Sequence, residues 1–154
     1  MLKVFDILKG QYEMFVINFF LFFSFRAYSS DLLPLNLFLK KNNNYQDVSR
    51  SIYILKRCAS LYNFIYRQEI EFQGYDKKIF IRYEKANDFY LSKLLDTVEK
   101  SYPKNKKFIE DLMKDMHKIT NIYRIDSINN FSKNKSYFKK SYILEDLKIC
   151  SKIK

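Results

Sequence analysis

Glycine and proline are almost absent from this chain, which has two of each among its 154 residues. Phosphate-cradling loops and dinucleotide-binding turns need glycine where the backbone approaches the ligand, and this sequence cannot supply it. A turn-rich β-sandwich and a collagen-like chain also need many more glycines. The shortage therefore excludes glycine-dependent nucleotide sites and turn-rich β folds.

Residues that serve as metal ligands or catalytic bases are also scarce. His117 is the single histidine, and the two cysteines, Cys58 and Cys150, stand far apart in the sequence. A zinc site needs three or four closely spaced ligands, so we expect no metal site. His117 lies in the charged stretch 114–118 and is expected to be a solvated surface residue, while Cys58 is expected to be a small core residue. With its carboxylates scattered among lysines, the chain is predicted not to be an enzyme, to have no catalytic residue and to carry no cofactor of its own.

Basic and aromatic residues are abundant instead. There are 28 Lys and Arg against 17 Asp and Glu, a formal net charge of +11, and aromatics make up 18% of the chain. Residues 1–39 contain three basic and three acidic side chains, so the whole excess lies in residues 40–154. The 47% hydrophobic content argues against a disordered chain. A basic body of this kind predicts an acidic partner: nucleic acid, a membrane surface or an acidic protein.

The N-terminal part contains an apolar run at residues 14–25. It is shorter than the roughly 17–25 residues that a helix needs to cross a bilayer, so we expect no stable membrane span. Its length fits the apolar core of a signal peptide, and the small residues Ala27, Ser29 and Ser30 follow it. A buried helix and a mitochondrial presequence are the other interpretations. All of them make residues 1–39 a separate targeting or extra helical segment.

Three stretches of the body place apolar residues three or four positions apart, which keeps one helix face apolar. They run from about 47 to 72, from about 76 to 101 and from about 104 to 128. Gly74 and Pro103 interrupt the pattern between them. Short connections between amphipathic helices make neighbours antiparallel, so the sequence predicts an all-α fold, an antiparallel three-helix bundle over residues 40–128. The Lys- and Ser-rich residues 129–154 are expected to form a flexible basic C-terminal tail.

A pattern of single residues runs through the first two predicted helices without a gap. Leu61 and Tyr62 are followed by Arg67, and the second helix carries Phe89 and then Lys93. This spacing resembles the LYR-motif family of small mitochondrial three-helix proteins. Members of that family begin with Leu-Tyr-Arg and a second Arg four residues later, and they have a Phe in the second helix.

Further residues resemble one branch of that family, the accessory subunits of mitochondrial cysteine desulfurases. Phe72, Tyr75 and Phe80 have the spacing of an aromatic cluster in those subunits, and Arg124 resembles the end of their third helix. The chain departs from the family at Asn63, which stands where the motif has its Arg.

The resemblance implies a non-enzymatic function. It implies an accessory and stabilising subunit of a cysteine desulfurase in iron–sulfur cluster biogenesis, located in the mitochondrial matrix. Proteins of this family also bind acyl carrier protein, a small acidic protein whose acyl-4′-phosphopantetheine enters the space between the three helices. The residues expected to contact the carrier protein and its acyl chain are Leu61, Tyr62, Arg67, Lys78, Arg82, Lys85 and Phe89. Those expected to contact the other partner are Phe72, Tyr75, Phe80 and Arg124.

Three other interpretations stay open at this point. The chain could be another LYR-type assembly factor or a respiratory-complex subunit, because the shared pattern does not name the client. Basic helices with interleaved Tyr and Phe also permit an RNA- or ribosome-associated protein, although the sequence contains no recognisable nucleic-acid-binding module. A secretory function for residues 14–25 would make the chain a secreted helical protein.

Overall fold

The computed structural model describes residues 32–41, 47–72 and 77–153, and these ranges are helical with no strand. The predicted all-α fold is therefore confirmed. The helices in these ranges are α2 (Leu35–Lys41), α3 (Val48–Phe72), α4 (Lys77–Ser101), α5 (Lys106–Asn134) and α6 (Tyr142–Cys150). The apolar run at 14–25 lies outside the described residues. Within them, no helix is long and apolar enough to cross a membrane.

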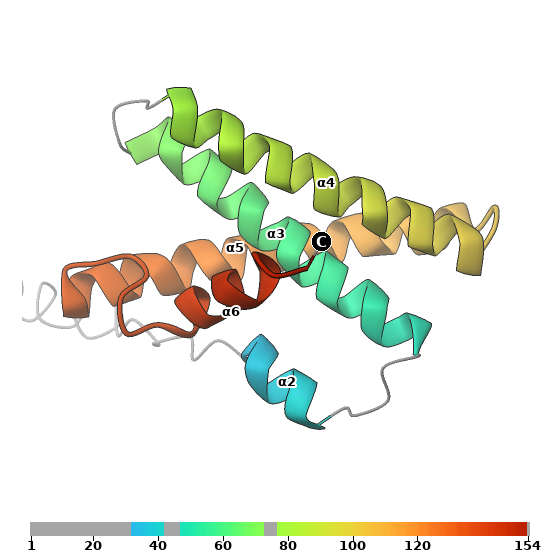
Figure 1. The fold of residues 1–154 in the computed structure, drawn as a ribbon, viewed down its shortest axis with the longest axis horizontal. Coiled ribbons are helices and arrows are strands. Elements are labelled where there is room, and N and C mark those ends of the chain that lie inside the picture. Colours follow the sequence, from blue (N-terminus) through green and yellow to red (C-terminus); the bar gives the residue numbers. More distant parts are fainter. Residues whose placement is uncertain (1–31, 42–46, 73–76, 154) are drawn as a thin grey trace, which may run out of the picture.

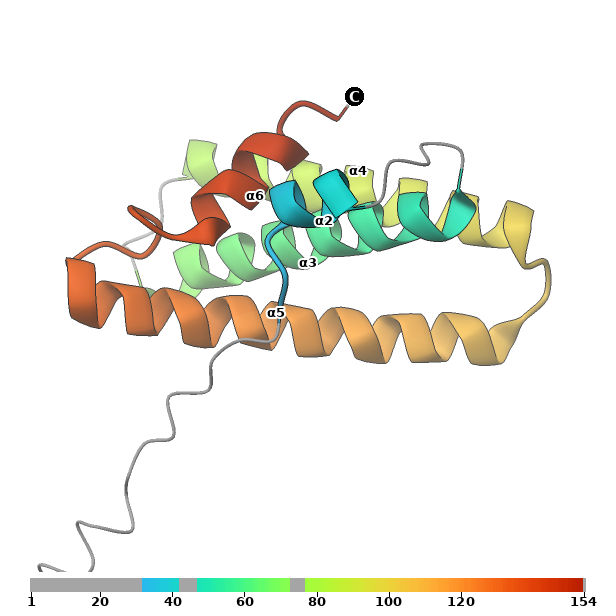
Figure 2. The same ribbon diagram turned by 90° about the horizontal axis from the view of Figure 1, so that it is seen from below.

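The helices α3, α4 and α5 lie where the spacing of apolar residues predicts the three-helix bundle. α4 runs back along α3, and α5 crosses beneath this pair (Figure 1). Turned by 90°, the molecule shows α3 between α5 on one side and α2 and α6 on the other (Figure 2). α3 therefore packs against α4, α5 and α6, while α2 packs against α6.

The turn between α4 and α5 has a clear local cause. Asn105 is the N-cap of α5, and its side-chain oxygen accepts a hydrogen bond from the backbone N–H of Phe108 at 3.0 Å. The ring of Phe108 stacks on Tyr102 on the other side of the turn, with centroids 4.6 Å apart. An N-cap of this type satisfies one of the backbone donors that a helix start leaves open. These contacts fix where the third helix of the bundle begins.

The hydrophobic core is built mainly from the faces of α3, α4 and α5 that the sequence pattern marks as apolar. Tyr62 stacks on Tyr90 with ring centroids 5.4 Å apart, and Leu61 and Leu94 are wholly buried beside them. From α5, Tyr123 adds a fully buried ring that stacks against Phe64 at 6.3 Å. Aromatic side chains thus fill much of the space between the helices.

The C-terminal residues correct one prediction, because residues 129–154 are not a flexible basic tail. α5 continues to Asn134, and α6 then folds back onto α3 with Ile143, Asp146 and Cys150 buried. Ser141 caps the start of α6 by accepting a hydrogen bond from the N–H of Ile143 at 3.2 Å. The prediction was wrong because the buried face of this short helix includes an aspartate, whose partner lies on a distant helix.

Candidate functional site

The most exposed group of candidate residues lies on the outer side of α4. Lys78, Arg82, Lys85 and Phe89 follow one another at steps of four, three and four residues, which places them on one helix face. The first three side chains are exposed, and Phe89 keeps 40% of its surface open to solvent. We call these four residues the basic α4 face. At its end, the Lys93 ammonium lies 4.6 Å from the centre of the Phe89 ring.

Two candidate residues of α3, Leu61 and Tyr62, are buried in the core, and Tyr62 lies in the α3–α4 interface. Leu61 is fully buried, and Tyr62 packs against Tyr83 as well as Tyr90. Burial, reinforced by Tyr83 and opposed by the positive charge of Arg82, raises the pKa of Tyr62 above its ordinary value. Arg82 therefore lies close enough to Tyr62 for its charge to oppose this rise in the pKa.

The remaining candidate residues are dispersed. Arg67 is exposed near the end of α3, and Phe80 packs its ring against Tyr66 with centroids 4.7 Å apart. Arg124 is exposed on α5, where its guanidinium donates to the Asn121 side chain. The side chains of Phe72 and Tyr75 lie outside the described residues. The structure thus brings together the basic α4 face and places Arg124 on a different layer.

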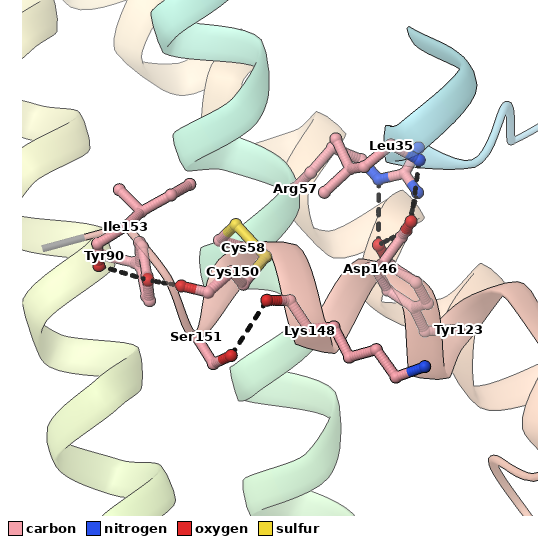
Figure 3. Close-up of a disulfide and its surroundings, with 10 residues drawn as sticks. All are labelled: Leu35, Arg57, Cys58, Tyr90, Tyr123, Asp146, Lys148, Cys150, Ser151 and Ile153. Carbon is pink, nitrogen blue, oxygen red and sulfur yellow. Dashed lines mark hydrogen bonds and ion pairs between the residues drawn. A yellow bond between two sulfur atoms is a disulfide. The ribbon is translucent and has the colours of Figure 1, made fainter. Parts of the chain in front are cut away.

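A buried ion pair that the sequence pattern did not reveal joins four helices. Arg57 on α3 and Asp146 on α6 have no side-chain exposure, and a guanidinium nitrogen of Arg57 contacts the Asp146 carboxylate directly (Figure 3). Tyr123 of α5 donates its hydroxyl to the same carboxylate at 2.7 Å and accepts from Arg57 Nε at 3.0 Å. The other oxygen of Asp146 accepts from the backbone N–H of Leu35, the first residue of α2, at 2.7 Å. We call these four residues the Arg57–Asp146 cluster.

Further hydrogen bonds hold the Arg57 side chain in place. Its Nη1 donates to the carbonyl of Leu33 at 2.8 Å and to the hydroxyl of Tyr53 at 3.1 Å. Burial alone would lower the pKa of Arg57, but Tyr123, Asp146 and Tyr53 together raise it above its ordinary value. Burial also holds the pKa of Tyr123 well above its usual range. The guanidinium therefore stays charged, and the cluster fixes how the helices pack.

A disulfide lies next to this cluster. Cys58 and Cys150 are both wholly buried and bonded to each other, with their Cα atoms 5.5 Å apart (Figure 3). The hydroxyl of Tyr90 donates to the carbonyl of Cys150 and to that of Ile153, the latter at 3.1 Å. Cys58 is a core residue, as predicted, but the two cysteines are not remote in space. They meet because α6 returns to the middle of α3.

No protein-family model, curated protein or solved structure matches the chain. The resemblance to the LYR-motif family therefore depends on the residue pattern alone. His117 is exposed on α5, as predicted. Within the described ranges, no group of three or more His, Cys, Asp and Glu side chains is placed to hold a metal ion. The arrangement that the structure offers for function is a basic, partly aromatic helix face on a firmly packed helical body.

Proposed function

We propose that this chain is a non-enzymatic accessory protein that stabilises a mitochondrial cysteine desulfurase and binds acyl carrier protein. One observation carries the proposal. The family-like pattern from Leu61 to Lys93 falls on the α3–α4 pair with Leu61 and Tyr62 buried and with Lys78, Arg82 and Lys85 exposed on one face. An accessory protein needs buried residues that stabilise its fold and exposed residues that contact its partner, and the pattern supplies both.

The basic α4 face suits a small acidic protein for electrostatic reasons. Complementary charge raises the association rate and orients the partner. Phe89 adds an exposed aromatic ring amid these cations, and aromatic side chains are common at the centres of interfaces. Arg67 lies near the end of α3 and adds a further cation to the same body.

The acyl-4′-phosphopantetheine of the carrier protein would meet a filled interior in this conformation. Leu61 and Leu94 are fully buried, and the Tyr62 ring stacks on Tyr90 between α3 and α4. An acyl chain entering here would have to displace these side chains. Burial of each methylene contributes about 0.8 kcal/mol, which is the driving force available for that rearrangement.

The disulfide favours a second candidate function. Disulfides persist in oxidising environments and are rare where thiol reductants are maintained. The Cys58–Cys150 bond, together with the apolar run at 14–25, supports a secreted helical protein stabilised by that bond. On this candidate, the basic α4 face binds an acidic partner outside the cell.

A binding experiment tests the first proposal. The full chain is immobilised and exposed to purified acyl carrier protein, with and without its acyl group, at low and physiological salt. We expect saturable binding whose association rate falls as salt rises. Charge reversal of the basic α4 face, by Lys78→Glu, Arg82→Glu and Lys85→Glu together, should lower the association rate at least tenfold.

The matched control reverses three exposed lysines of α5, Lys107→Glu, Lys114→Glu and Lys133→Glu, and so changes the net charge equally. It should have a clearly smaller effect than the α4 variant. Equal loss in both variants would show that only net charge matters, and the proposed face would be wrong. Co-purification of the desulfurase with the full chain tests the other half of the proposal, and its absence would contradict it.

Location separates the two candidate functions. A tagged copy expressed in its native cell should reach the mitochondrial matrix if the chain is the accessory subunit. Export of the tagged copy, with the disulfide formed, supports the second candidate and rejects the first.

A further inference from the structure

A cavity of about 460 Å³ lies between α2, α3, α4 and the C-terminal end of the described chain. This volume falls within the range of roughly 300–1,000 Å³ that is typical of small-molecule sites. None of the described residues that line it belongs to α5, so it is separate from the space between the three helices of the bundle. The lining residues are Leu39, Arg50, Ser51, Ile54, Leu55, Lys93, Thr97 and Ile153.

The walls of the cavity combine apolar surface with positive charge. Leu39, Ile54, Leu55 and Ile153 supply aliphatic side chains from three different parts of the fold. The charged side chains among the described lining residues, Arg50 and Lys93, are both cations.

The two cations differ in how deeply they are buried. Arg50 is only 5% exposed, and its Nη2 donates to the carbonyl of Leu39 at 3.4 Å, which positions the guanidinium beside the end of α2. Lys93 is half-buried on α4, with its ammonium over the Phe89 ring. An anion in the cavity would therefore meet a buried guanidinium and a half-buried ammonium.

We propose that this cavity binds an aliphatic carboxylate. Its head would interact with Arg50 and Lys93, and its tail would lie along Leu39, Ile54 and Leu55. A carboxylate matches the planar guanidinium fork of Arg through charge-assisted hydrogen bonds. A phosphate ion would leave the aliphatic walls unused, and a neutral lipid would leave the two cations unused. The thioester of a carrier-bound acyl group has no carboxylate, so this ligand is a different one.

Calorimetric titration of the full chain tests the proposal, with sodium octanoate as the probe and 1-octanol and inorganic phosphate as comparisons. We expect saturable octanoate binding at one site, with octanol and phosphate at least tenfold weaker. Arg50→Gln should weaken octanoate binding at least tenfold, because it removes a charge-assisted contact. Lys93→Gln should weaken it about threefold to tenfold, and it leaves the more buried Arg50 in place if Arg50→Gln fails to fold.

Lys100→Gln is the matched control, because Lys100 is exposed on the same helix and does not line the cavity. Its octanoate affinity should equal that of the unmodified chain. The proposal is overturned by equal affinity for octanoate and octanol, by the absence of saturable binding, or by unchanged affinity in Lys93→Gln. Charge reversal of the basic α4 face should leave octanoate binding intact, so this inference and the proposed function can fail separately.

Discussion

The basic α4 face and the Arg57–Asp146 cluster use charge in opposite ways. On the basic α4 face, the cations are exposed and the helix beneath them packs through other residues. In the Arg57–Asp146 cluster, the cation Arg57 is wholly buried and paired with Asp146. Exposed charges contribute little to stability, whereas a buried pair that loses one member leaves an uncompensated charge in a medium that solvates it poorly. The basic α4 face therefore suits recognition, and the Arg57–Asp146 cluster holds the fold.

The largest expected effect comes from breaking the buried pair. Asp146→Ala leaves the Arg57 guanidinium without its carboxylate and should lower the free energy of unfolding by about 3–5 kcal/mol. Urea denaturation followed by circular dichroism measures this change. Replacing both partners, Arg57→Met with Asp146→Leu, should recover most of the loss because no buried charge remains. A loss below about 1 kcal/mol for Asp146→Ala would show that the Arg57–Asp146 cluster does not hold the fold and so does not differ in this way from the basic α4 face.

The next effect concerns the disulfide, which joins residues 92 positions apart. Replacing Cys58 and Cys150 by Ser should lower the free energy of unfolding by about 2–4 kcal/mol, mainly because the unfolded chain gains freedom. Adding dithiothreitol to the unmodified chain should give a loss of similar size. The Ser variant provides the control, since dithiothreitol should not change its stability.

A smaller effect, dependent on pH, is expected at Tyr90. Burial, reinforced by Tyr62, raises the pKa of Tyr90 from 10.0 to about 12. The folded state then keeps a proton that the unfolded state has lost, so stability is complete below pH 10 and falls as the pH rises toward 12. Tyr90→Phe should cost about 1 kcal/mol at neutral pH through its lost hydrogen bonds and should make the decline above pH 10 less steep. An unchanged slope in this variant would show that the Tyr90 hydroxyl titrates normally.

The smallest effect on stability is expected on the basic α4 face. Neutralising Lys78, Arg82 or Lys85 with Gln should change the free energy of unfolding by no more than about 0.5 kcal/mol each, because these side chains are exposed. The same substitutions should slow association with an acidic partner. Urea denaturation and binding kinetics on the same samples would show this separation. A loss of more than about 1 kcal/mol would mean that this face also holds the fold.

The bundle could be predicted from the sequence because its information is local. The spacing of apolar residues predicted α3, α4 and α5, and Gly74 and Pro103 indicated the connections between them. The basic residues of α4 were expected from the family resemblance, and their steps of four and three residues place them on one helix face. These features depend on residues only a few positions apart, which a single sequence displays directly.

The docking of α6 onto α3 could not be predicted for the opposite reason. Arg57 and Asp146 are 89 positions apart, and each looks like a surface charge until its partner is known. Asp146 also interrupts the apolar face of α6, which made this helix look like part of a polar tail. Cys58 and Cys150 were the sequence signal for the contact between α3 and α6, because two cysteines in apolar surroundings can form a disulfide. Their spacing in the sequence alone did not reveal that bond.

Two adjacent residues of α3 are joined to two residues of α6, one by an ion pair and one by a disulfide, and this arrangement has a mechanical consequence. Arg57 and Cys58 are adjacent, and their partners Asp146 and Cys150 lie one helical turn apart, so α6 is held at two points on one side. Tension applied at Ile153 would pass through the disulfide directly into α3. The segment containing α4 and α5 is enclosed by this covalent link and would carry none of the load. Stretching the oxidised chain should therefore yield a much shorter extension than stretching the reduced chain.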